Sequence, residues 1–94
     1  MSEFRQSVMI VNKRGLHARA SAKFVGAVAA LEEGVSVKVA KDANTAAGGS
    51  ILGLMMLGAA KGDTVDVIVE GEGDGAQGVL DDLVALIANG FGEE

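Results

Sequence analysis

Residues 12–25 read NKRGLHARASAKFV, and this stretch joins a predicted strand to a predicted helix. It holds His17, the single histidine of the chain, with Gly15 before it and Arg19 after it. Glycine permits a tight turn just upstream of the imidazole. The first N–H groups of a helix lack internal partners and carry partial positive charge, so they favour an anion such as phosphate. The stretch therefore predicts a histidine that attacks phosphorus at a helix N-terminus.

A single histidine near the start of a helix is most often an ordinary polar surface residue, so His17 alone is a weak signal. Arg19 strengthens it, because a guanidinium can hold two phosphate oxygens at once. The longer string is specific. Gly-Leu-His-Ala-Arg at 15–19, followed by Ala-Ser-Ala-Lys-Phe-Val at 20–25, resembles the active-site signature of the HPr family, the histidine-containing phosphocarrier proteins of the bacterial phosphotransferase system. The resemblance is greatest to the proteobacterial branch, which includes the nitrogen-related carrier NPr.

Length and composition narrow the class of protein. A chain of 94 residues supports one domain, residues 1–94, with one small core. With no cysteine and one histidine, we expect no disulfide, no metal site and no cofactor. Residues 1–11 lack the apolar core of a signal peptide, and no apolar run approaches the ~20 residues of a membrane span. We therefore expect a cytoplasmic protein without membrane insertion, and a monomer.

The charges are divided between the two halves of the chain. The net charge of −5 argues against nucleic-acid binding. Every charged residue between Phe4 and Leu31 is basic, and every one after Lys61 is acidic. The basic segment around His17 suits an anionic group or an acidic partner. Alternatively, the two segments neutralise each other within the fold.

Hydrophobic periodicity predicts seven elements. Alternation indicates strands over 4–11, 35–40, 45–47 and 65–70, and helical spacing indicates helices from His17 to about 32–34, over 50–58 and over 76–88. The order β-α-β-β-α-β-α predicts an α+β fold with helices on one face of an antiparallel sheet. It is also the order of the HPr fold, an open-faced β-sandwich of four antiparallel strands and three helices. We expect Val79, Leu83 and Leu86 to form the inner stripe of the last helix, with Leu80 and Ile87 flanking it, and the tail after it to fray.

The resemblance assigns roles to the residues around His17. It implies that His17 is phosphorylated on Nδ1 by enzyme I, which phosphoenolpyruvate charges, and that an enzyme IIA-type protein accepts the phosphoryl group. Arg19 matches the active-site arginine of the family. Such a site should be exposed and completed only by the partner. One departure is visible, because many family members carry proline where this chain has Ala20.

A second matching stretch is Ser-Ile-Leu-Gly-Leu-Met-Met-Leu at 50–57. In the family this serine is a regulatory site for HPr kinase/phosphorylase, so the resemblance implies the same for Ser50, which is also a good helix N-cap. Ile51, Leu52 and Met55 correspond to the apolar face that docks partners, while Leu54 and Leu57 would point inward. The alternative is that Met55 and Met56 belong to the core.

We interpret the chain as a phosphoryl carrier with a covalent phosphohistidine intermediate, rather than as a stand-alone enzyme. Two alternatives remain open. The first is a purely regulatory module of the same fold, controlled by phosphorylation of Ser50. The second is a small ligand- or RNA-binding domain, which the acidic balance and the absence of Tyr and Trp disfavour. The sequence does not decide between sugar transport and nitrogen or carbon signalling.

Overall fold

The computed structural model describes residues 2–31, 33–71 and 75–93. Its elements follow the predicted order, with a short 3₁₀ turn at Gly90–Gly92 added after the last helix. In chain order they are β1 (Ser2–Met9), α1 (Ala18–Ala29), β2 (Ser36–Lys41), β3 (Asn44–Ala47), α2 (Ile51–Met56), β4 (Thr64–Gly71) and α3 (Gly75–Ala88). The helix after His17 thus ends earlier than predicted, at Ala29.

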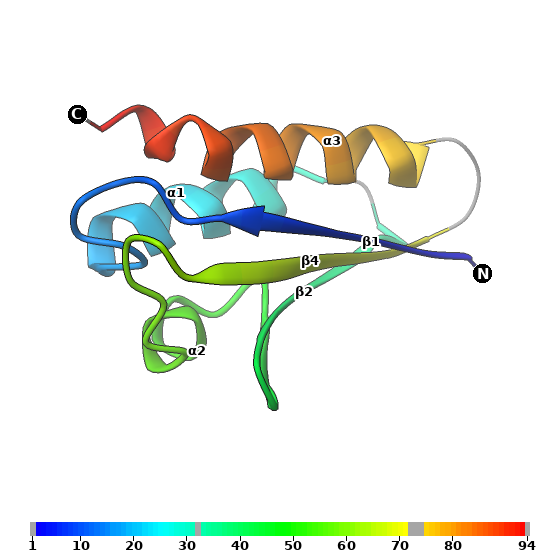
Figure 1. Ribbon diagram of the computed structural model, residues 1–94. Coiled ribbons are helices and arrows are strands. Elements are labelled where there is room, and N and C mark those ends of the chain that lie inside the picture. Colours follow the sequence, from blue (N-terminus) through cyan, green and yellow to red (C-terminus); the bar gives the residue numbers. More distant parts are fainter. Residues whose placement is uncertain (1, 32, 72–74, 94) are drawn as a thin grey trace.

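The strands form one antiparallel sheet in the order β1-β4-β2-β3. Helices α1 and α3 lie together against one face of this sheet, and α2 packs against α1 and β3 at the end of the molecule (Figure 1). The predicted α+β fold with an open-faced antiparallel sheet is therefore confirmed. Alternation works as expected, since the valines of β2 and β4 that face the helices are buried: Val37, Val39, Val65, Val67 and Val69. None of the described helices is both long and apolar enough to cross a bilayer.

The rotation of α3 differs from the prediction. Leu80 and Ile87 are fully buried together with Leu83, whereas Val79 and Leu86 are only partly buried. The prediction was therefore correct at Leu83, whereas Leu80 and Ile87, expected only to flank the stripe, take the buried places given to Val79 and Leu86. Apolar residues cover a wide arc of this helix, so two adjacent stripes satisfy the helical spacing equally well. Packing against β1, β4 and α1 decides between them.

The tail after α3 is folded against the domain, so the expectation that it frays was wrong. Phe91 is only 1% exposed and adopts a left-handed conformation with φ 59°. That conformation costs about 1–2 kcal/mol in a residue other than glycine, and burying a phenylalanine returns roughly 1.5–3 kcal/mol. Lys23 Nζ of α1 also donates to the Phe91 carbonyl at 2.6 Å. The end of the chain is thereby held beside the start of α1.

The loop between β1 and α1 is set by a close approach of two backbone segments. Leu16 N donates to the Ala59 carbonyl at 3.0 Å. Gly15 lies at φ +60°, and a Cβ atom there would be 2.3 Å from the Ala59 oxygen. Only glycine fits this position, because both the backbone conformation and the space exclude a side chain. This contact fixes where the helix that follows begins.

We predict that Gly15→Ala lowers the free energy of unfolding by about 2–4 kcal/mol, through left-handed strain and the clash with Ala59. Gly26→Ala is the matched control. Gly26 lies in the middle of α1 with open space around its Cα, so alanine there should raise stability by roughly 0.5–1 kcal/mol. Urea unfolding of the three proteins measures both effects. Equal stability of wild type and Gly15→Ala would contradict the proposed constraint.

Candidate functional site

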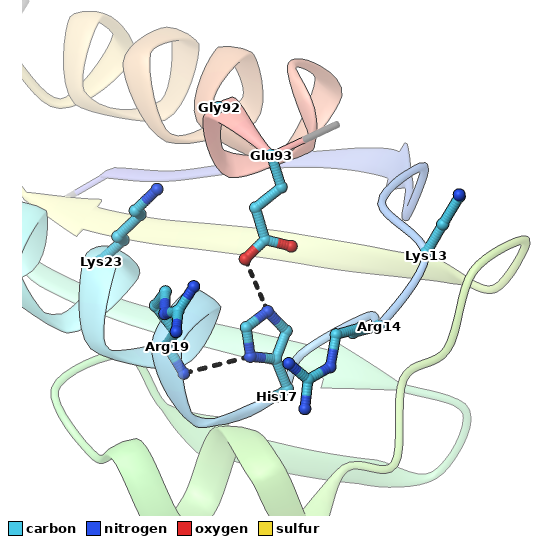
Figure 2. Close-up of a pocket in the computed structure, with 7 residues that line it drawn as sticks. All are labelled: Lys13, Arg14, His17, Arg19, Lys23, Gly92 and Glu93. Carbon is cyan, nitrogen blue, oxygen red and sulfur yellow. Dashed lines mark hydrogen bonds and ion pairs between the residues drawn. The ribbon is translucent and has the colours of Figure 1, made fainter.

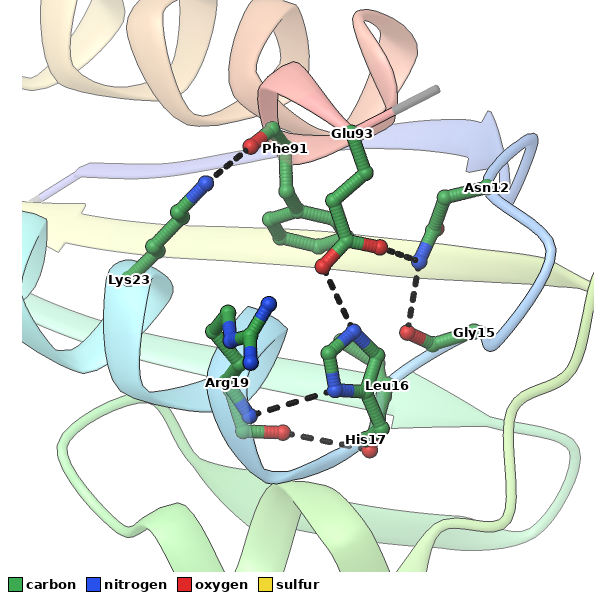
Figure 3. Close-up of polar contacts among 9 residues, drawn as sticks. Asn12, Gly15, Leu16, His17, Arg19, Lys23, Phe91 and Glu93 are labelled. Carbon is green, nitrogen blue, oxygen red and sulfur yellow. Dashed lines mark hydrogen bonds and ion pairs between the residues drawn. The ribbon is translucent and has the colours of Figure 1, made fainter.

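His17 is the N-cap residue of α1. Its backbone is extended (φ −72°, ψ 177°), and its carbonyl accepts the N–H of Ser21 at 2.9 Å. Its side chain caps the helix, because Nδ1 accepts the backbone N–H of Arg19 at 3.2 Å (Figure 3). Capping by a side-chain acceptor satisfies one of the free donors of the first turn. The structure therefore places His17 at the helix N-terminus, as predicted from the sequence, with Nδ1 against the first turn.

The imidazole is more enclosed than expected. Its Nε2 lies 2.6 Å from Glu93 Oε2, and the side chains of His17 and Glu93 are only 15% and 18% exposed. An open ring that only a partner completes was expected from the sequence, and in this structure that expectation was wrong. The carboxylate that covers the ring comes from the folded tail, 76 positions along the chain.

Asn12 connects the loop before His17 to the same carboxylate. Its Nδ2 donates to the Gly15 carbonyl at 2.8 Å and to Glu93 Oε1 at 2.9 Å. Asn12 is 3% exposed, and its Oδ1 has no hydrogen-bond partner among the described residues. Each oxygen of Glu93 is therefore held by a different side chain (Figure 3). No role for Asn12 or Glu93 was predicted from the sequence, because Asn12 lies before the signature at 15–25 and its contact with Glu93 spans 81 positions.

Cations surround the pocket in front of the imidazole. Lys13, Arg14, Arg19 and Lys23 line it together with His17, Gly92 and Glu93 (Figure 2). Four basic residues and one carboxylate thus line the same pocket. One acidic residue of the second half enters the basic site, so the two segments neutralise each other there in part, and the basic residues outnumber it. The arrangement can bind a multiply charged anion beside the imidazole. Among the described ranges, no three His, Cys, Asp or Glu residues gather as they would around a metal ion.

Several groups act on the ionisation of Glu93. Partial burial would by itself raise the pKa of its carboxyl. The hydrogen bonds from Asn12 and His17, together with the nearby positive charge of Lys23, outweigh burial and lower that pKa below its usual 4.5. The carboxylate is therefore the form that the site favours.

The second predicted stretch forms α2. Ser50 is its N-cap, and its Oγ accepts the Gly53 N–H at 2.9 Å. Leu54 and Leu57 are buried as predicted. The alternative that the two methionines belong to the core was wrong, because four apolar side chains of α2 are exposed: Ile51, Leu52, Met55 and Met56. Since α2 packs against α1, this apolar surface belongs to the same end of the molecule as His17.

The lowered pKa of Glu93 predicts a pH dependence of stability. A carboxyl whose pKa falls on folding stabilises the folded state above its unfolded pKa, and this contribution disappears as the pH drops through the folded value. Wild type should therefore be more stable than Glu93→Gln near pH 7, and the difference should shrink as the pH falls below about 4.5. Thermal unfolding of both proteins between pH 7 and pH 3 measures it.

Glu33→Gln is the control for this titration, because it makes the same chemical change at an exposed residue beyond the far end of α1. Its stability relative to wild type should not follow the titration of Glu93. A constant difference between wild type and Glu93→Gln across the whole pH range would show that the carboxylate form does not matter.

The chain is similar to known proteins in both sequence and fold. A family model described as the PTS HPr component phosphorylation site matches residues 4–89. The chain is 42% identical to phosphocarrier protein HPr of Cupriavidus necator, over 95% of this chain and 96% of that protein. It is 36% identical to phosphocarrier protein NPr of Shewanella violacea, over 99% and 98%. The crystal structure of HPr from Thermoanaerobacter tengcongensis superposes with a TM-score of 0.79 at 37% identity, over 100% and 99% of the two chains. The chain therefore belongs to the HPr family of phosphocarrier proteins of the bacterial phosphotransferase system.

Proposed function

We propose that His17 of this carrier accepts a phosphoryl group on Nδ1 from enzyme I and passes it to an enzyme IIA-type acceptor. One observation supports this most directly: the single histidine caps α1, with Nδ1 accepting the Arg19 N–H, beside a pocket lined by four cations. Membership of the family supports phosphorylation of a histidine, and the basic residues of the pocket would attract the negatively charged phosphoryl group.

The transfer is a displacement at phosphorus between two histidines. The lone pair of His17 Nδ1 forms the new N–P bond while the P–N bond to the donor breaks, and that electron pair returns to the donor imidazole. The Arg19 N–H, which Nδ1 accepts in the free protein, then becomes available to a phosphoryl oxygen. The Arg19 guanidinium, which also lines the pocket, offsets the charge on the moving group. Arg19 therefore contributes twice, through its backbone N–H and through its guanidinium.

The exposed face of α2 is the proposed docking surface for both partners. Ile51, Leu52 and Met55 are exposed apolar residues on a short helix that packs against α1. Exposed apolar side chains next to a reactive group are typical of a protein-binding surface, and methionine adapts to partners of different shape. The proposal also includes cytoplasmic location and a monomeric state, which suit a carrier that moves between proteins.

Ser50 is proposed as a regulatory site for HPr kinase/phosphorylase. Its hydroxyl already caps α2, so a phosphate there would bring negative charge to the start of this helix and to the edge of the docking surface. The alternative function, a purely regulatory module controlled by Ser50, needs no phosphorylation of His17. The two are therefore separable by the position and the acid stability of the phosphoryl group.

Incubation with enzyme I and phosphoenolpyruvate should add the mass of one phosphoryl group, and mild acid should remove it. His17→Asn should abolish this gain, since asparagine keeps a good N-cap acceptor but is no nucleophile. Ser50→Ala should retain it. Intact-protein mass spectrometry measures the gain in mass for wild type and for both variants. Absence of the acid-labile gain in wild type would favour the purely regulatory alternative.

Leu52→Asp should slow phosphorylation by enzyme I at least about tenfold, mainly by raising KM, because a charge replaces an apolar contact that a partner buries. Leu52 is 67% exposed, so the fold should persist. Ala85→Asp adds the same charge at an exposed position of α3 and should leave the rate unchanged. Steady-state phosphorylation rates test both variants. Unchanged kinetics of Leu52→Asp would remove this residue from the docking surface.

A further inference from the structure

The contact between His17 and Glu93 determines where the imidazole proton lies. A carboxylate can only accept a hydrogen bond, so a 2.6 Å contact to Nε2 requires the proton on Nε2. The contact of the other ring nitrogen leads to the same proton position. Nδ1 accepts the Arg19 N–H, so Nδ1 must present a lone pair and cannot carry the proton. Two independent contacts, one from the tail and one from α1, therefore specify a single tautomer of neutral His17 (Figure 3).

We infer that Glu93 is a positioning residue, which holds the proton of His17 on Nε2 and thereby reserves Nδ1 for the phosphoryl group. This inference rests on the proposed function. It concerns the tail of the chain, which the sequence motif around His17 does not reach.

The charge balance of the transfer gives this carboxylate a second effect. When Nδ1 forms its bond to phosphorus, Nε2 keeps its proton, so the ring itself gains a positive charge. Glu93 Oε2 lies against that side of the ring and offsets the charge as it develops. When the phosphoryl group leaves, the ring becomes neutral again with the same proton in place. No proton has to enter or leave the site in either direction.

The way the tail is built supports a dedicated role. Glu93 follows three consecutive left-handed residues, Gly90, Phe91 and Gly92, of which Phe91 carries a side chain. Phe91 is buried, and Asn12 fixes the second carboxylate oxygen. Backbone conformations of this kind persist where the surrounding structure enforces them and often occur at functional sites. The competing explanation is that Glu93 only attaches the tail to the domain.

The test compares wild type with Glu93→Gln and Glu93→Ala. In the ¹⁵N-labelled protein without phosphate, long-range ¹⁵N–¹H NMR spectra report which nitrogen of His17 carries the proton. Wild type should show a protected Nε2–H and a bare Nδ1. Glu93→Gln can donate its amide to Nε2, so part of the population should carry the proton on Nδ1. In Glu93→Ala the Nε2 proton should lose its protection from exchange with solvent.

The same variants are then phosphorylated by enzyme I and phosphoenolpyruvate. Glu93→Gln should lower kcat by about 10- to 100-fold with little change in KM, as expected for loss of a group that orients a reacting imidazole. Glu33→Gln should match wild type in both measurements. If wild type itself accepts no phosphoryl group, the proposed function fails, while the NMR spectra still judge the inference.

A further variant separates positioning from attachment of the tail. Lys23→Met removes the hydrogen bond to the Phe91 carbonyl and leaves the carboxylate in place. It should lower stability and keep the tautomer of wild type. If Glu93→Gln lowers stability to a similar extent, yet has the tautomer and the kcat of wild type, Glu93 only attaches the tail and the inference is overturned.

Discussion

The close approach of residue 15 to Ala59 is the constraint on which the site depends. The backbone of the loop after β1 touches the segment between α2 and β4, with a hydrogen bond from Leu16 to the Ala59 carbonyl. This contact fixes where the chain turns, so the next residue, His17, must become the cap of α1. The direction of Nδ1 follows from the start of the helix, and the position of the ring in turn decides which group from the tail can reach Nε2. The positions of His17 Nδ1 and Nε2 therefore both depend on the contact between residue 15 and Ala59.

The site contains basic residues that attract an anion and also the Glu93 carboxylate, which competes with that anion for the same positive charge. Four cations line the pocket, while one carboxylate already occupies part of it and is held by Asn12 and the imidazole. A carrier must bind its phosphoryl group well enough to collect it, but not so well that transfer onward stalls. A pocket that is positive on balance, yet not uniformly positive, fits that requirement. The internal carboxylate also offsets part of the positive charge that the pocket presents to solvent.

Features that depend on contacts between residues close in sequence were the most predictable. His17, Arg19 and the helix that follows could be placed from one continuous string, because capping and helical spacing are local. The valine strands and the buried side of α2 also followed from periodicity, as Leu54 and Leu57 show. The rotation of α3 could not be predicted, since its apolar arc is too wide to select one stripe. Glu93 could not be found either: its role depends on a contact across 76 positions, and a left-handed phenylalanine before it has no sequence signature.

The order of strands in the sheet governs how the molecule assembles. β1, at one edge, pairs with β4, so Ser2 meets Gly71 and most of the chain must be present before the first strand finds its neighbour. Closing so long a loop is entropically costly, and contacts distant in sequence slow folding. Two of the residues that orient the imidazole, Ala59 and Glu93, lie far beyond it in the sequence. During synthesis, His17 therefore leaves the ribosome before Ala59 and Glu93, the residues that position its ring, have been added to the chain.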